Sequence, residues 1–177
     1  MPPPRILFLH GLEGSPQGNK VRNLRASGFD VTAPALNPTA VVACLAAGEP
    51  VPQSAFTGPL ESAVVALNEA APNLLMGSSF GGGLAMELVH RGLWSGPLVL
   101  LAPAGRKLFG LAHLPGGRGR VLVAHGRQDA VVPVAHSVEL AASTPGEVQL
   151  WLLDDDHRLD ASVNSGLLGR LVRAAVE

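Results

Sequence analysis

The sequence predicts an α/β fold, a three-layer α/β/α sandwich in which helices cover both faces of a mostly parallel sheet of about six strands. Apolar runs of strand length alternate along the chain with segments of helical spacing, which is typical of such layered folds. The runs are short and mostly free of polar residues, as expected for strands buried on both faces. We expect the strands at residues 5–9, 29–33, 73–76, 97–102, 120–125 and 148–153.

Between the first two expected strands, the sequence contains signals for both ends of a helix. Ser15 can cap its start, Pro16 suits its first turn and Gly28 ends it. The stretch 35–71 is less regular, because prolines divide it into two segments rich in alanine and valine. We expect these two segments to form short helices.

The later helices follow from the spacing of apolar residues. One is expected at 81–91, directly after the third strand, and others at about 134–143 and about 161–175. The connection 104–119 is irregular and rich in glycine. The whole chain, residues 1–177, is expected to form a single domain, because its length suits one hydrophobic core.

Composition excludes several classes of function. Hydrophobic residues make up 47% of the chain and charged residues 15%, with a net charge of −1, which argues against a disordered tail or a nucleic-acid-binding surface. No apolar run approaches the ~20 residues of a membrane span, and the apolar run near the N-terminus is too short for the apolar core of a signal peptide. We therefore expect a soluble, cytoplasmic protein. The lone cysteine, Cys44, cannot form an internal disulfide.

The pentapeptide Gly77-Ser78-Ser79-Phe80-Gly81 lies between the third strand and the helix that follows it. This G-x-S-x-G pattern is typical of a nucleophile elbow, a strained turn that presents the central serine and needs small flanking residues. Ser79 is therefore the candidate nucleophile. Pentapeptides of small residues also arise by chance, so the interpretation requires a base, an acid and an oxyanion hole elsewhere in the chain.

A nucleophilic serine needs a general base, because a free hydroxyl is almost fully protonated at neutral pH. The acid and then the base follow the serine in the chain order typical of this motif, which excludes His10. Five histidines remain: His90, His113, His125, His136 and His157. His90 lies roughly 16 Å from Ser79 along one helix, and His125 is expected to shape a turn. His157 directly follows the last strand, at the carboxyl edge of the sheet, and is the expected base.

The acid that orients the base should also follow a strand. The fifth strand ends in a loop whose one carboxylate is Asp129, which completes a candidate catalytic triad; alternatively, Asp129 caps a helix or closes a turn. The run 154–156 places three further aspartates beside His157. Such a run is commonly a solvated loop, although one of its carboxylates could raise the pKa of the imidazole or pair with Arg158.

An oxyanion hole needs backbone donors, commonly the N–H after the nucleophile and one from the loop after the first strand. These are the N–H groups of Phe80 and Leu12, and we expect His10 and Gly11 to line the substrate site. The same loop could instead be a glycine-rich turn or an anion site at a helix N-terminus. Neither a phosphate-loop pattern nor a metal-ligand spacing is present, so no cofactor or metal is expected.

Four motifs match a known superfamily: Phe8-Leu9-His10-Gly11, Gly77-Ser78-Ser79-Phe80-Gly81-Gly82, His125-Gly126-Arg127-Gln128-Asp129-Ala130-Val131-Val132-Pro133 and Asp156-His157. The chain resembles the α/β-hydrolase superfamily throughout its length. Its small size and its Leu-His-Gly-x-x-x-Ser-Pro opening are similar to those of the compact, lidless bacterial esterases of the YqiA type. Fuller members begin with an antiparallel hairpin and insert a cap where this chain has the short connection 104–119, so a minimal fold without a cap is expected.

The resemblance implies a Ser–His–Asp hydrolase that cleaves small acyl esters or thioesters through an acyl-enzyme, with Ser79, Asp129 and His157 as the triad. A similar triad can also cleave peptides, lactones or C–C bonds, and a hydrolase fold can serve as a binding or regulatory module without turnover. Nucleotide binding through residues 11–15 is a third alternative. Nothing in the sequence indicates the oligomeric state.

Overall fold

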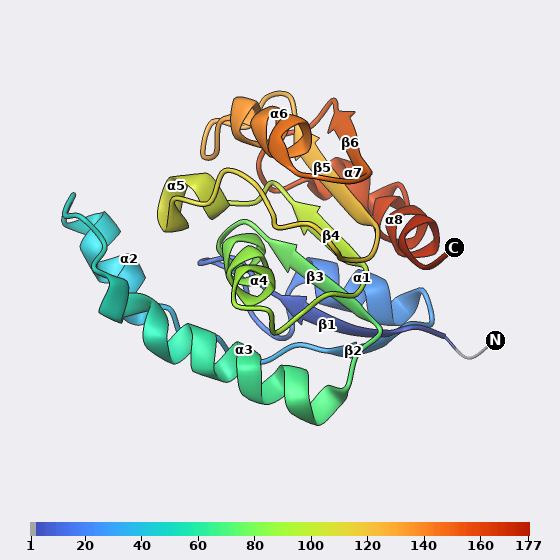
Figure 1. Cartoon of the computed structure of the whole chain (residues 1–177), viewed down its shortest axis with the longest axis horizontal. Helices are drawn as coiled ribbons and strands as arrows, with labels where there is room; N and C mark the ends of the chain where they lie inside the picture. Colours follow the sequence, from blue (N-terminus) through green and yellow to red (C-terminus); the bar gives the residue numbers. More distant parts are fainter. Residues whose placement is uncertain (1–2) are drawn as a thin grey trace.

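The computed structural model describes residues 3–177. One sheet of six strands, in the order β2-β1-β3-β4-β5-β6, runs through the centre of the molecule, and every neighbouring pair is parallel (Figure 1). The strands are β1 (Arg5–Leu9), β2 (Asp30–Thr32), β3 (Leu74–Ser78), β4 (Leu98–Leu101), β5 (Val121–Gly126) and β6 (Val148–Leu153). Each overlaps an expected strand, which confirms the predicted α/β class.

Helices cover both faces of this sheet. They are α1 (Asn19–Ala26), α2 (Thr39–Ala46), α3 (Thr57–Ala70), α4 (Phe80–His90), α5 (Gly105–Phe109), α6 (Val134–Ser143), α7 (Asp160–Asn164) and α8 (Leu167–Val176), with a 3-10 turn η1 (Gln53–Phe56). One face packs against α3, α4 and α6, and the other against α1, α7 and α8. Because side chains alternate along each strand, both faces are apolar and two cores form.

The first helix starts later than expected. Residues 15–18 form a turn in which the N–H of Gly18 donates to the carbonyl of Ser15 at 3.0 Å, and the N–H of Gln17 donates to Ser15 Oγ at 3.2 Å. Serine therefore closes a turn before the helix, which begins only at Asn19, rather than capping the helix itself.

The expected helix over 161–175 is two helices, α7 and α8, because Gly166 between them has a φ of +87°. A right-handed helix cannot pass through that conformation, although glycine adopts it without strain. The stretch 35–71 also differs from expectation, since one of its two helices, α3, has 14 residues. The prolines lie before and at the start of α3, where they do not interrupt it.

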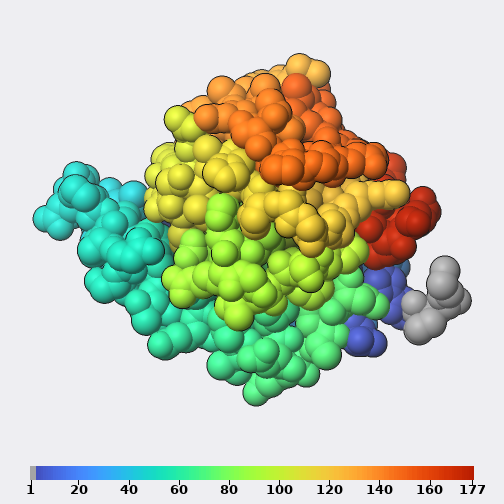
Figure 2. All heavy atoms as spheres, in the orientation of Figure 1, coloured from blue at the N-terminus to red at the C-terminus, as the bar shows by residue number. Residues whose placement is uncertain are grey.

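The connection between β4 and β5 holds only one short helix, α5, within the part of the chain described, and no cap covers the sheet edge. By contrast, the segment around α2, coloured cyan, projects from the body of the molecule (Figures 1 and 2). Val42 and Leu45 are exposed on it. None of the helices found among residues 3–177 is both long and apolar enough to cross a bilayer.

Candidate active site

Ser79 stands between the end of β3 and the start of α4, with a φ of +54° that an L-residue adopts only under strain. A Cβ at Gly77 would lie 2.4 Å from the carbonyl oxygen of Gly81, and a Cβ at Gly81 would lie 2.0 Å from that of Leu9. Only glycine fits at these two positions. The sharp turn therefore depends on the same small residues from which the elbow was predicted.

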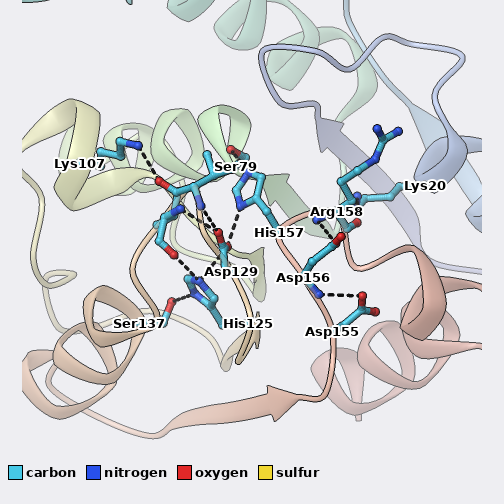
Figure 3. Close-up of polar contacts among 12 residues, drawn as sticks. Lys20, Ser79, Lys107, His125, Asp129, Ser137, Asp155, Asp156, His157 and Arg158 are labelled. Carbon is cyan, nitrogen blue, oxygen red and sulfur yellow. Dashed lines mark hydrogen bonds and ion pairs between the residues drawn. The ribbon is translucent and has the colours of Figure 1, made fainter.

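The structure brings the three expected triad residues together (Figure 3). Ser79 Oγ lies 2.9 Å from His157 Nε2, and His157 Nδ1 lies 2.6 Å from Asp129 Oδ2. The Asp129 side chain has no exposed surface, and that of His157 is 18% exposed. A hydrogen-bonded chain thus runs from a fully buried carboxylate to a serine hydroxyl that a substrate can reach.

The partners of His157 define how its ring is protonated at rest. Because a carboxylate only accepts hydrogen bonds, Nδ1 carries the proton and donates to Asp129, which leaves Nε2 free to accept from Ser79. Burial acts to raise the pKa of Asp129, but hydrogen bonds from His157 and from the N–H groups of Val132 and Val131 outweigh it, and the pKa lies below its ordinary value. The carboxylate is therefore ionised at neutral pH.

The loop after β1 lies directly against the serine. A Cβ at Gly11 would be 3.4 Å from Ser79 Cβ and 4.0 Å from Ser79 Oγ. Among the described residues, the backbone hydrogen bonds leave the N–H groups of Leu12 and Phe80 without a partner. Both expected oxyanion donors are thus without a backbone acceptor, and their role stays a prediction.

His10 shapes this loop. Its Nδ1 lies 2.8 Å from the carbonyl oxygen of Gly11, and its Nε2 accepts the N–H of Leu36 at 3.3 Å. Nε2 must therefore be unprotonated, so Nδ1 donates to Gly11. With both nitrogens occupied, the ring holds the Gly11 backbone in place, while the expected substrate contact of His10 and Gly11 stays a prediction.

A cavity of about 440 Å³ opens at the site. Ser79 and His157 line it together with the loop after β1 and the first turn of α1, including Lys20. Its volume is within the range of small-molecule pockets. A smaller hollow of about 180 Å³, between α3 and α4, contains none of the triad residues.

No protein-family model and no curated protein matches the sequence. Solved structures match it over nearly its whole length. A proposed hydrolase of the alpha/beta superfamily from Xanthomonas campestris is 22% identical, with 97% of this chain and 95% of that one covered at a TM-score of 0.66. An alpha-beta serine hydrolase homologue from Coxiella burnetii is 17% identical, with 96% and 84% covered at a TM-score of 0.68. The chain has the α/β-hydrolase fold. A monoacylglycerol lipase from Paleococcus ferrophilus shares it at 13% identity, with 95% and 93% covered and a TM-score of 0.67.

In this α/β-hydrolase fold, the turn between β5 and α6 that carries Asp129, here called the acid turn, makes more hydrogen bonds than the sequence suggested. His125 was expected to shape the turn after β5, and its Nε2 does hydrogen bond to the carbonyl of Val132 at 3.0 Å. It also contacts two side chains that sequence reasoning did not connect with it: Nε2 lies 3.0 Å from Asp129 Oδ2, and Nδ1 lies 2.7 Å from Ser137 Oγ on α6. Figure 3 shows this second histidine on the far side of Asp129 from His157.

Two lysines also support the site, and sequence reasoning gave neither a role. Lys107 Nζ donates to the carbonyl of Val131 and so ties α5 to the acid turn. Lys20 Nζ donates at 2.6 Å to the carbonyl of Arg158, the residue after the base. Burial lowers the pKa of Lys20. Such contacts join segments far apart in sequence, so no local pattern could have indicated them.

Two of the three aspartates beside His157 accept hydrogen bonds from backbone N–H groups near the base. Asp155 accepts the N–H of Ser162 at 2.8 Å, and Asp156 accepts the N–H of Arg158 at 2.8 Å. The Arg158 guanidinium pairs with Asp160 at 3.1 Å rather than with any of the three. Asp155 and Asp156 thus shape the loop that carries the base, whereas Asp154 accepts a hydrogen bond from the side chain of Gln128 in the turn after β5.

The remaining histidines lie away from the serine. His90, the last residue of α4, contacts the carbonyl of His113 through Nε2 at 2.7 Å. Within residues 3–177, no three His, Cys, Asp or Glu side chains are grouped so that they could hold a metal ion.

Proposed function

We propose that this chain is a serine hydrolase that cleaves carboxylic ester or thioester bonds of small acyl substrates. The observation that carries the proposal is the hydrogen-bonded chain Ser79–His157–Asp129, with distances of 2.9 and 2.6 Å. A serine hydroxyl bonded to a neutral imidazole, which a buried carboxylate orients, is the arrangement that nucleophilic acyl transfer requires.

The geometry supports a two-stage mechanism. His157 Nε2 takes the hydroxyl proton as Ser79 Oγ attacks the acyl carbon, and the N–H groups of Leu12 and Phe80 stabilise the oxyanion. The C–O or C–S bond then breaks, and His157 returns the proton to the leaving group. Water next attacks the acyl-enzyme while His157 accepts its proton, and the acid leaves as Ser79 regains its hydrogen. Throughout, the Asp129 carboxylate stabilises the imidazolium.

Esters are the favoured substrates because of the character of the cavity and of the structural neighbours. The cavity of about 440 Å³ suits a small acyl substrate, and Ser79 and His157 both line it. Two of the similar structures are a metagenome-derived lipolytic enzyme and a monoacylglycerol lipase.

The first test is Ser79→Ala, with Ser78→Ala as a matched control that makes the same chemical change one residue away. Removing the nucleophile should lower kcat for an activated ester about 10⁴- to 10⁶-fold, whereas Ser78→Ala should retain activity. Wild type should show a burst of product and take a fluorophosphonate label on Ser79, located by mass spectrometry. A turnover rate that Ser79→Ala leaves unchanged, or a label on another residue, would refute the mechanism.

A second test separates the bond classes. Matched ester, thioester, lactone, C–C and peptide substrates with the same acyl group should show cleavage of the first two. Preferential cleavage of another class would keep the triad and replace the substrate. Ligand binding without turnover would favour a binding module instead, and a thermal shift with nucleotides would favour the nucleotide alternative.

A further inference from the structure

His125 is a fully buried histidine whose two nitrogens both contact the machinery around the acid. It lies near the end of β5 and its side chain has no exposed surface. Nδ1 is 2.7 Å from Ser137 Oγ on α6, and Nε2 is 3.0 Å from both the Val132 carbonyl oxygen and Asp129 Oδ2. Burial of a histidine is costly unless its ring nitrogens are hydrogen-bonded, and both nitrogens of His125 have partners.

These partners assign the protonation of His125. A carbonyl and a carboxylate can only accept, so Nε2 carries a proton. It hydrogen bonds to the Val132 carbonyl, and Asp129 Oδ2 lies equally near, at 3.0 Å. Burial lowers the pKa of His125 below its ordinary value despite the nearby carboxylate, so the ring is neutral and Nδ1 accepts the hydroxyl proton of Ser137. Ser137 thereby fixes the tautomer and the rotation of the ring.

The Asp129 carboxylate is held on every side. The N–H groups of Val131 and Val132 each donate to Oδ1 at 2.8 Å, and His157 and His125 approach Oδ2 at 2.6 and 3.0 Å. Since the turn fixes Oδ1 and the base occupies one side of Oδ2, His125 is the contact that defines the other side. Two imidazoles of different chain segments thus share one oxygen.

We propose that His125, held by Ser137, is a positioning residue for the acid, and that its Nε2–H fixes the carboxylate of Asp129 in the orientation in which Oδ2 accepts the proton of His157 Nδ1. The inference rests on the proposed hydrolase function. It assigns the chain Ser137–His125–Asp129 as a support behind the triad, with no proton leaving His125 during turnover.

The test uses two substitutions that keep different parts of the imidazole. The amide nitrogen of glutamine can occupy the place of Nε2, whereas that of asparagine reaches only as far as Nδ1. His125→Asn should therefore lose the contact to Asp129 and lower kcat about 10-fold, the effect of one hydrogen bond to a charged group. His125→Gln should restore most of kcat, and KM should stay near the wild-type value in both variants.

A pH profile distinguishes positioning from simple folding. Asp129 and His157 are the charged or titratable groups that act on His125, while Lys107 reaches only the carbonyl of Val131. Without the His125 donor, the charge of Asp129 is less neutralised, so it stabilises the imidazolium form of His157 more strongly. The acidic limb of kcat/KM should therefore move to higher pH in His125→Asn and stay at the wild-type position in His125→Gln.

The results can refute the positioning role of His125 without refuting the hydrolase function. Wild-type kcat in His125→Asn, or an equal loss in His125→Asn and His125→Gln with an unmoved acidic limb, would overturn positioning while Ser79 labelling kept the hydrolase intact. Should His125→Asn fail to fold, Ser137→Ala decides, because it frees the ring without altering its size. A lower kcat at unchanged KM supports the inference, and wild-type kcat refutes it.

Discussion

Asp129 shows how a single residue couples the site to stability. Its carboxylate is buried, yet its pKa lies below the ordinary value because hydrogen bonds from His157 and the backbone outweigh burial. A pKa that is lower in the folded state than the ordinary ~3.9 means that ionisation of Asp129 stabilises the fold. That stabilisation is present above about pH 4 and is lost as the pH falls through the folded-state pKa.

Asp129→Asn should therefore remove part of the acid sensitivity of the protein. The difference in unfolding free energy between wild type and Asp129→Asn should shrink as the pH is lowered from about 6 to about 3, measured by urea denaturation at each pH. Asp155 also has a lowered pKa, but it is present in both proteins and cancels in the difference. A difference that stays constant or grows on acidification would contradict the assigned direction.

At the scale of elements, the break between α7 and α8 depends on one glycine. Gly166 has a φ of +87°, and its N–H donates to the carbonyl of Val163 at 3.0 Å. The backbone at this point turns so that α8 can lay Leu167, Leu168 and Leu171 into the core against the sheet. A continuous helix would point these side chains elsewhere.

Gly166→Ala should lower the unfolding free energy by about 1 kcal/mol, because the Cβ of alanine makes the left-handed conformation strained, whereas glycine adopts it freely. Gly169, three residues on, is the matched control: it lies inside α8, and the nearest side-chain neighbour of an added Cβ is the flexible Arg173 guanidinium, at 3.4 Å. Gly169→Ala should raise stability by about 0.5–1 kcal/mol through helix propensity. Urea denaturation of both variants checks this, and equal shifts of one sign would refute it.

The elements of this fold differ in how far the sequence alone predicts them. The strands were predictable because burial on both faces leaves continuous apolar runs. The grouping of Ser79, Asp129 and His157 was predictable because strand ends of a parallel sheet share one edge. The break at Gly166 was not, because the apolar spacing continues across it. The contacts of His125 with Asp129 and Ser137, and those of Lys107 and Lys20, were not predictable for another reason: they join separate segments of the chain.

At the scale of the whole molecule, parallel topology assembles the site. Ser79 follows β3, Asp129 follows β5 and His157 follows β6, and Gly126 at the end of β5 pairs with Leu153 at the end of β6. The acid turn and the loop that carries His157 therefore leave the sheet side by side, at its carboxyl edge. In the described chain nothing larger than α5 stands between β4 and β5, so this connection adds no cap to the edge.

An uncovered edge sets a limit on the acyl chain. An enclosed apolar tunnel would bury every added methylene, and at about 0.8 kcal/mol each this would raise kcat/KM about 4-fold per carbon. The cavity of about 440 Å³ instead ends at the molecular surface. We expect kcat/KM for p-nitrophenyl esters to rise only up to short acyl chains and then to level off or fall towards dodecanoate, with Ser79→Ala subtracted as background. A steady 4-fold rise per carbon throughout the series would require an apolar channel, whereas the lining of this cavity includes Lys20, Arg22 and Asp160.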